Sequence, residues 1–328
     1  MPLAVITITF DPVLRLSDTS SVRYETIALA IVLLLGLMVA ARIASRTPAD
    51  DDADAPERLR LDDLVFVSVG AVPGAIVGGR LGYILDHLDY YRANGAAIFD
   101  AAQGGLTLGL AVPLGILTGA AIARLLGASV GRWLGAAALP LLFVLAAGKL
   151  VGVLGATGQG AGSDLPWATA YASAGPWGSL AADLPAHPSQ VYEAVLLALA
   201  IPVLYVGTRV VADRRPGAAM FLALGLWSVV RILVGATWRD ATVLGPVRIE
   251  QVLAVVVLGI AVVGLVDRAR PVTRATVLFL DPQPEIPPAP PAGRKFGRGR
   301  VSASTDDHSR PPDPKPRKRR ARNEVPRS

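Results

Sequence analysis

Long apolar runs recur along the first 270 or so residues of the chain, separated by short polar segments. At a rise of 1.5 Å per helical residue, each run is long enough to cross the hydrocarbon core of a bilayer. The runs are residues 26–44, 64–85, 104–126, 133–156, 191–210, 217–236 and 249–266. The pattern predicts an all-α polytopic membrane protein of about seven transmembrane helices.

The second apolar run carries a series of closely spaced glycines. They are Gly70, Gly74, Gly78, Gly79 and Gly82. Residues three or four positions apart share one face of a helix, and glycines on such a face let a neighbouring helix approach closely. The spacing therefore predicts tight packing of this run against another helix.

Basic residues occur on alternate connections between the runs. The connections after the first, third and fifth runs carry arginines such as Arg42, Arg132 and Arg214, and the segment after the seventh run is strongly basic. The remaining connections hold few basic residues. These are residues 86–103, 157–187 and 237–247. Because basic connections stay in the cytoplasm, we expect the N-terminus outside and the C-terminus in the cytoplasm.

The same patterns divide the chain into three parts. Residues 1–24 are expected to form an extracytoplasmic segment, and residues 25–267 a seven-helix domain with a small extracytoplasmic cap at 157–188. Residues 268–328 are rich in proline and basic side chains, which predicts a disordered cytoplasmic tail. A basic tail beside a membrane favours anionic lipid as its partner, and no nucleic acid is expected.

Composition agrees with a membrane protein and limits the chemistry. Hydrophobic residues make up 52% of the chain, charged residues 18%, and mean hydropathy is +0.47. The net charge of +6 arises largely in the C-terminal tail. The chain has no cysteine, which excludes disulfides and a cysteine nucleophile of its own. His87 and His187 lack a second ligand at metal-binding spacing, so neither metal nor cofactor is expected.

The candidate functional residues are ionisable side chains in or beside the apolar runs. Arg80, Lys149 and Arg231 lie in the second, fourth and sixth runs, in the half that the expected topology places outside. Glu193 opens the fifth run and ends the polar heptad that begins at His187. A cation inside the bilayer costs about 2.5–3.5 kcal/mol on the insertion scale. Each of these cations therefore needs a counter-charge.

Two sources of that counter-charge remain open. The first is internal pairing with carboxylates near the outer helix ends, namely Glu193, Glu250, Asp240 and Asp86. The second is the phosphate of an anionic lipid, which suits the fork of an arginine guanidinium. For Lys149 alone, snorkelling of the side chain to the outer interface is the favoured interpretation.

Several short motifs occur along residues 63–266 in the order of a known family. They are Gly78-Gly79-Arg80-Leu81-Gly82-Tyr83, Gln103-Gly104-Gly105, Ala147-Gly148-Lys149-Leu150, Asp164-Leu165-Pro166-Trp167, His187-Pro188-Ser189-Gln190-Val191-Tyr192-Glu193, Arg231, Trp238-Arg239-Asp240 and Glu250-Gln251. The heptad ending at Glu193 is the most specific of them. On these motifs the chain resembles the prolipoprotein diacylglyceryl transferases, which are seven-span enzymes of the bacterial cytoplasmic membrane.

The resemblance implies a reaction and its partners. The family transfers the diacylglyceryl group of phosphatidylglycerol to the lipobox cysteine thiol in the signal peptide of a prolipoprotein. A thioether forms, glycerol phosphate leaves, and no cofactor takes part. The absence of cysteine from this chain is consistent with a nucleophile that belongs to the substrate.

The resemblance also implies a site at the outer leaflet. The implied catalytic residues are Arg239, Glu193 and Tyr83, and the implied substrate-binding residues are Lys149, Arg80, Arg231, His187, Gln190 and Tyr192. Arg239 and Lys149 are expected to hold the lipid phosphate and to stabilise the departing charge. Glu193, Tyr192 and Arg80 are expected to position groups in the cavity.

The chain departs from the family pattern at the position of a proposed base. The family has a histidine after the glycine pair that opens its third span, and this chain has Gly109 there. Tyr83 or His87 is the substitute base that the sequence offers.

Three further departures follow in the fourth span and beyond it. A family arginine is Lys149 here, which loses bidentate phosphate geometry. A family asparagine and glutamate fall at Gly152 and Thr157. Two interpretations therefore remain open: a divergent transferase, or a non-catalytic relative that binds anionic phospholipid or assists another membrane protein.

Overall fold

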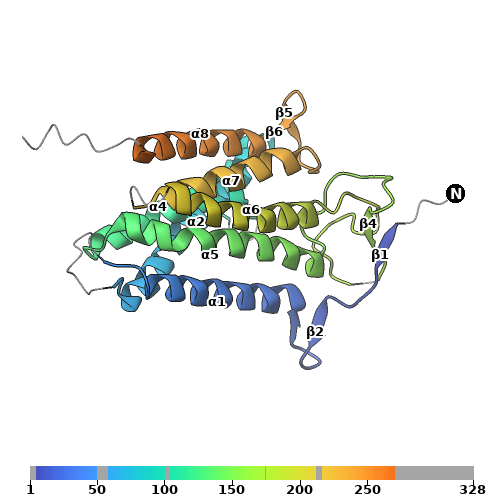
Figure 1. Cartoon of the computed structure of the whole chain (residues 1–328). Helices are drawn as coiled ribbons and strands as arrows, with labels where there is room; N and C mark the ends of the chain where they lie inside the picture. Colours follow the sequence, from blue (N-terminus) through green and yellow to red (C-terminus); the bar gives the residue numbers. More distant parts are fainter. Residues whose placement is uncertain (1–4, 50–57, 101–103, 174, 212–215, 270–328) are drawn as a thin grey trace, which may run out of the picture. The chain divides into compact units, whose positions relative to one another are not determined.

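The computed structural model describes residues 5–49, 58–100, 104–173, 175–211 and 216–269. The tail predicted for residues 268–328 lies almost wholly outside these ranges. Most of the described chain is helical, and the strands are two or three residues long (Figure 1). The prediction of an all-α architecture is confirmed.

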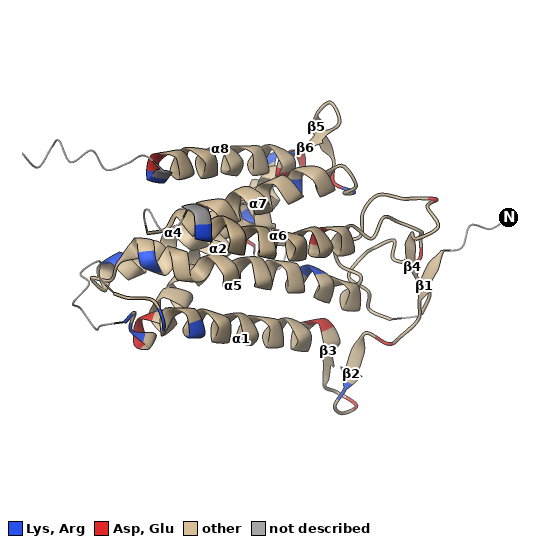
Figure 2. Cartoon of the chain, viewed as in Figure 1, with Lys and Arg blue, Asp and Glu red and all other residues tan. Residues whose placement is uncertain are grey.

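Within the described residues, seven helices are long and apolar enough to cross a membrane, as the apolar runs predicted. They are α1 (Tyr24–Ala44), α2 (Leu61–Asp86), α4 (Leu108–Leu125), α5 (Val130–Val151), α6 (Ser189–Val211), α7 (Ala218–Gly235) and α8 (Ile249–Ala269). Short helices α3 (Leu88–Ala93), η1 (Gly95–Phe99) and η2 (Gly152–Gly155) lie in the connections. Charged side chains are sparse along most of the length of these helices (Figure 2).

Two helix ends differ from the apolar pattern. The third apolar run begins at residue 104, but α4 begins only at Leu108. Gly104 has a φ of +103° and Thr107 is extended, so the first residues of the run form a connection. The fourth run reaches residue 156, but α5 ends at Val151 and continues as η2. Hydropathy marks the apolar stretch, whereas backbone geometry decides where the helix within it begins and ends.

Helices α2 and α4 pack closely through the glycines of α2. A Cβ atom on Gly78 would collide with the carbonyl oxygen of Leu110, and one on Gly74 would collide with that of Leu114. A Cβ on Gly82 would collide with the hydroxyl of Thr107. The predicted small-residue face is confirmed, and it brings the backbone of α2 directly against α4.

Helix α7 is the most enclosed of the membrane helices. In the 18-residue apolar stretch of α7, 61% is buried inside the protein, compared with 22% in the corresponding stretches of α1, α2 and α8. Trp227 on α7 is fully buried, in one core with Leu142 of α5 and Leu197 of α6. A polar side chain on α7 must therefore find its partners within the protein.

Short strands join the N-terminal segment to the cap. Strand β1 (Ile6–Ile8) pairs in parallel with β4 (Thr169–Tyr171). Strands β2 (Val13–Arg15) and β3 (Ser21–Arg23) form a hairpin before α1, and β5 (Thr242–Leu244) pairs with β6 (Val247–Arg248) before α8. Figure 1 shows β1 and β4 at the same end of the bundle as the N-terminal end of α1. The N-terminal segment and the cap thus form one structure.

Tyr171 anchors this structure to the membrane domain. Its side chain is 1% exposed, and its hydroxyl donates a hydrogen bond to the carbonyl oxygen of Val153 at 2.9 Å. Burial raises the pKa of Tyr171 to about 12. The phenol therefore stays protonated and remains a donor throughout the physiological pH range.

The close approach of α2 and α4 predicts unequal effects of two glycine-to-alanine changes. Gly78→Ala should lower the free energy of unfolding by about 1–3 kcal/mol, because the new methyl group meets the Leu110 carbonyl. Gly259→Ala on α8 is the matched control, since nothing lies within 4 Å of its added Cβ. Thermal unfolding in detergent measures both variants. Equal shifts in Tm would contradict the packing.

Candidate active site

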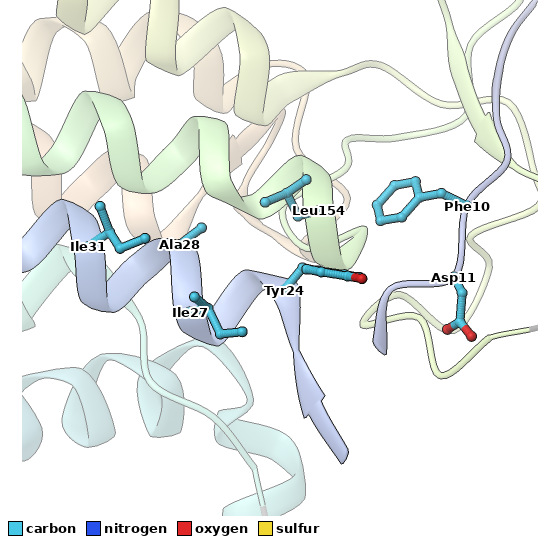
Figure 3. Close-up of a pocket in the computed structure, with 7 residues that line it drawn as sticks. All are labelled: Phe10, Asp11, Tyr24, Ile27, Ala28, Ile31 and Leu154. Carbon is cyan, nitrogen blue, oxygen red and sulfur yellow. The ribbon is translucent and has the colours of Figure 1, made fainter. Parts of the chain in front are cut away.

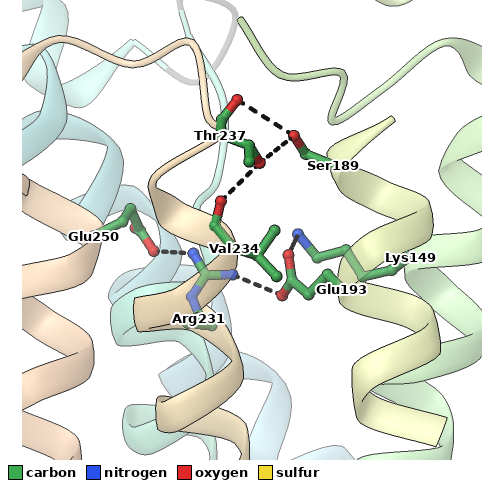
Figure 4. Close-up of polar contacts among 7 residues, drawn as sticks. All are labelled: Lys149, Ser189, Glu193, Arg231, Val234, Thr237 and Glu250. Atoms are coloured by element: carbon green, nitrogen blue, oxygen red, sulfur yellow. Dashed lines mark hydrogen bonds and ion pairs between the residues drawn. The ribbon is translucent and has the colours of Figure 1, made fainter. Parts of the chain in front are cut away.

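Four charged side chains, one from each of four helices, meet inside the bundle. They are Lys149 of α5, Glu193 of α6, Arg231 of α7 and Glu250 of α8. Their charges alternate along the chain of contacts, so the group as a whole is neutral (Figure 4). We call these four residues the charge network.

Glu193 and Arg231 are the central members of the charge network. One carboxylate oxygen of Glu193 lies 2.8 Å from Lys149 Nζ, and the other accepts a hydrogen bond of 3.1 Å from Arg231 Nη1. Arg231 Nη2 donates to Glu250 Oε2. The side chains of Glu193 and Arg231 are 1% and 4% exposed, whereas that of Lys149 is 22% exposed. The network is therefore buried at its centre and open at the lysine end.

The charge network identifies the counter-charges that the buried cations require. Lys149 and Arg231 are balanced by Glu193 and Glu250, so internal pairing is the arrangement found for both cations. The expectation that Lys149 snorkels to the outer interface is wrong, because its ammonium group pairs with buried Glu193. Glu193 Oε2 lies 2.8 Å from Lys149 Nζ and supplies the counter-charge within the bundle.

Aromatic rings enclose the guanidinium of Arg231. The guanidinium carbon lies 4.4 Å from the ring centroid of Trp238 and 5.5 Å from that of Trp227. A ring face attracts a cation most strongly where water is excluded. Trp238 therefore belongs to the site, and its family motif was the only sequence feature that pointed to it.

Arg80 fastens the connection between α2 and α4. Its guanidinium donates hydrogen bonds to the carbonyl oxygens of Ala97 at 2.8 Å, Asp100 at 2.9 Å and Ile98 at 3.3 Å. The guanidinium also lies 5.4 Å from the ring centroid of Tyr91. Backbone carbonyl oxygens accept these hydrogen bonds from Arg80. The sequence alone had offered a carboxylate or a lipid phosphate as its partner.

Arg239 lies beyond the C-terminal end of α7, in contact with the cap. Its Nε donates to the carbonyl oxygen of Gly160 and its Nη1 to Ser179 Oγ, both at 3.2 Å. The side chain is exposed, and among the described residues no carboxylate pairs with it. Arg239 is therefore a positioned cation with room for an external anion.

The polar heptad at the start of α6 ties that helix to α7 and to the cap. Ser189 Oγ lies 2.7 Å from Thr237 Oγ1, and Tyr192 Oη accepts a hydrogen bond of 2.7 Å from Trp167 Nε1. Gln190 is 2% exposed, and its Oε1 accepts no hydrogen bond from the described residues. The His187 ring lies 6.2 Å from that of Tyr192, with Nδ1 likewise buried and unpartnered.

Tyr83 and His87 line a cavity at the C-terminal end of α2. Their rings stack with centroids 4.1 Å apart, and Tyr90, Tyr91 and Gly104 complete the lining. The cavity measures about 370 Å³. The two candidate bases thus lie together, at the end of the bundle where the charge network also lies.

Thr157, at the position of a family glutamate, contacts a carboxylate from another helix. Its hydroxyl donates a hydrogen bond of 2.7 Å to Glu25 Oε1 in the first turn of α1. Arg23 Nη2 lies 3.4 Å from the other oxygen of Glu25. Sequence reasoning missed Glu25, because a contact between positions 25 and 157 leaves no signal in a single sequence.

An apolar groove lies beside the N-terminal end of α1 (Figure 3). It has a volume of about 610 Å³ and is lined by Phe10, Asp11, Tyr24, Ile27, Ala28, Ile31 and Leu154. No member of the charge network lines it. The groove is therefore separate from the polar site.

Together, the apolar helices and the charge network define a polytopic membrane protein with a polar site inside its helix bundle. A family model described as prolipoprotein diacylglyceryl transferase matches residues 13–266, and the chain belongs to this family. The family is one of enzymes, so the expectation of a transferase is confirmed and the non-catalytic relative is not favoured.

Curated relatives carry the same description. The chain is 31% identical to the phosphatidylglycerol–prolipoprotein diacylglyceryl transferase of Beijerinckia indica over 239 residues, which cover 70% of this chain and 80% of the relative. It is 31% identical to that of Geobacter sulfurreducens, over 65% of this chain and 81% of the relative. It is 24% identical to that of Acaryochloris marina, over 74% and 85%.

The charge network predicts that its central carboxylate matters most for stability. Glu193→Ala removes the partner shared by Lys149 and Arg231 and should cost about 3–5 kcal/mol, as breaking a buried ion pair does. Asp89→Ala is the control, because its pair with Arg92 is fully exposed and should leave Tm unchanged. Thermal unfolding in detergent compares the two. A Glu193→Ala protein as stable as the control would show that the network does not hold the bundle together.

Proposed function

We propose that the chain transfers the diacylglyceryl group of phosphatidylglycerol to the lipobox cysteine thiol of a prolipoprotein. Its family membership over residues 13–266 supports this activity. The polar site at the outer helix ends supports it as well, because the phosphate of a lipid lies at that depth in a bilayer. Since the chain has no cysteine, the thiol comes from the precursor.

Arg239 carries this proposal as the group that receives the lipid phosphate. The cap fixes its guanidinium through Gly160 and Ser179, and no described carboxylate neutralises it. Lys149 is the second group that binds the phosphate. One of its three N–H donors faces Glu193, and the other two are left to bind an anion. Two cations at the leaving phosphate stabilise the charge that develops there.

The remaining site residues then shape the cavity. Glu193 and Arg231 hold Lys149 in place through the charge network. Tyr192 fixes the cap through Trp167, and Gln190 offers a buried acceptor to the substrate. Arg80 contributes by fastening the wall of the cavity that Tyr91 helps to line.

We further propose a bacterial cytoplasmic membrane location with the N-terminus outside. Residues 1–24 and the cap at 157–188 then lie outside, where the precursor arrives. Residues 25–267 form the membrane domain, and residues 268–328 follow in the cytoplasm. The distribution of arginines among the connections supports this orientation.

The transfer is tested in cells depleted of their own transferase. Expression of this chain should restore diacylglyceryl labelling of a lipoprotein precursor. Arg239→Ala should lower the labelling rate about 10²-fold or more, the usual effect of removing a group that stabilises developing charge. Arg92→Ala is the control, since this arginine is exposed and its carboxylate partner among the described residues is the exposed Asp89.

Two results would contradict this proposal. If the chain accumulates in the membrane and no precursor is labelled, the transferase function is wrong. If labelling persists unchanged in Arg239→Ala, the assignment of Arg239 to the phosphate is wrong.

The orientation can be tested because the chain has no cysteine of its own. A single cysteine at Asp183, which is exposed in the cap, should react with a membrane-impermeant maleimide in intact cells. A single cysteine at Ser45, which is exposed after α1, should react only after the cells are permeabilised. The reverse pattern would show the opposite orientation.

A further inference from the structure

The carboxylate of Glu250 occupies the space of the missing side chain at position 109. A Cβ atom on Gly109 would lie 2.7 Å from Glu250 Oε2, 2.8 Å from Oε1 and 2.9 Å from the carboxyl carbon. A Cβ on Gly82 would lie 3.7 Å from Oε1. Two glycines on α2 and α4 thus make room for a carboxylate that α8 supplies.

The two oxygens of Glu250 have different surroundings. Oε2 accepts the hydrogen bond from Arg231, whereas Oε1 is buried and accepts none from the described residues. The hydroxyl of Thr107, which faces Gly82, is also buried and unpartnered. Leaving a buried polar atom unpaired destabilises the folded protein. Such atoms at a site call for a ligand or a catalytic role.

Glu250 also lies where the chemistry is expected. It is the second residue of α8, and Gly109 is the second residue of α4. Gly82 directly precedes Tyr83, which lines the cavity of about 370 Å³. The unpartnered oxygen therefore lies among the end turns of three helices, one of which also contributes Tyr83 to that cavity.

We propose that Glu250 is the general base that takes the proton from the substrate thiol. This inference rests on the proposed transferase function and assigns the step for which position 109 offers no side chain. Glu250 is preferred to His87, whose ring is exposed and whose Nδ1 lies 3.0 Å from the Tyr83 carbonyl oxygen.

The step balances without any further reactant. The thiol proton passes to Glu250 Oε1, and the thiolate sulfur attacks the glyceryl carbon that carries the phosphate oxygen. A carbon–sulfur bond forms as the carbon–oxygen bond breaks, and its electron pair leaves with glycerol phosphate. The proton on Glu250 then passes to water or to the departing phosphate.

Charged groups face Glu250 from two neighbouring helices. Arg231 of α7 binds Oε2, and Asp86 of α2 lies close enough to interact with it electrostatically. On α4 the facing residues, Thr107 and Gly109, are uncharged. Glu193 lies behind Arg231 and shares its charge. Glu193 has Lys149 as a second partner, whereas Glu250 has only Arg231 in the charge network, so Oε1 of Glu250 is left to accept the thiol proton.

The test is the pH dependence of labelling by purified full-length protein, with Glu250→Gln compared with wild type. At pH 6.5 the variant should be about 10²-fold slower, the usual contribution of a general base. At pH 9.5 it should recover to within about tenfold, because a free thiol with a pKa of about 8.5 ionises without help. Asp183 is an exposed carboxylate of the cap, so Asp183→Asn should have the wild-type labelling rate at both pH values.

Three other outcomes of this labelling experiment would each contradict a specific claim. A rate equal to wild type at pH 6.5 overturns the base assignment and leaves the transferase function standing. An equal loss at both pH values also overturns it, because a purely structural carboxylate gives no recovery with pH. Failure of wild type to label any precursor overturns the transferase function and this inference together.

A second variant covers the case in which Glu250→Gln does not fold. Gly109→His alone should accumulate poorly, since its Cβ meets the Glu250 carboxylate. Gly109→His with Glu250→Gly should accumulate and label at pH 6.5, because the histidine then has space and supplies a base. A double variant that folds but labels no faster than Glu250→Gly alone would overturn the proposal.

Discussion

The structure depends on Arg231, a cation that the most enclosed helix carries into the bundle. A guanidinium buried inside the bundle is tolerated only with carboxylates beside it. Glu193 and Glu250 both face this one. These two contacts set the rotation of α6 and α8 against α7, because each carboxylate must point inward. Lys149 then adds α5 to the same group. One buried charge thus orders four helices around a polar centre.

Carboxylates from distant positions recur in this site. Glu250 of α8 fills the space above Gly109, and Glu25 of α1 accepts a hydrogen bond from Thr157. In both cases the residue at the family position is small or uncharged, and a neighbouring helix supplies the acid. An ionisable group can be kept in a site while the position that carries it changes. A comparison of single positions therefore underestimates what the site retains.

The number and nature of the membrane helices follow from hydropathy, because the bilayer imposes a minimum apolar length on each one. The need for counter-charges follows equally, since Arg231 stands in an apolar run. The choice of partners does not follow, because Glu193, Glu250, Asp86 and Asp240 satisfy the same requirement on sequence alone. Three-dimensional packing selects among them.

Other features leave still less trace in the sequence. Arg80 donates hydrogen bonds to backbone carbonyls. Because every residue has a backbone carbonyl, no sequence pattern predicts which residues accept these bonds. The strands are too short to show an alternating pattern, and the start of α4 depends on the backbone at Gly104 and Thr107.

The parallel pairing of β1 with β4 has a consequence for biogenesis. Ile6 pairs with Thr169, so β1 waits for its partner strand until four apolar helices and the first part of the cap have been synthesised. Pairing across so long a stretch of chain closes late, because the loop between the strands must first be ordered. The pairing of the N-terminal segment with the cap therefore forms only after α5 has been synthesised. Until then β1 has no partner strand, and the site beneath the cap is still unfinished.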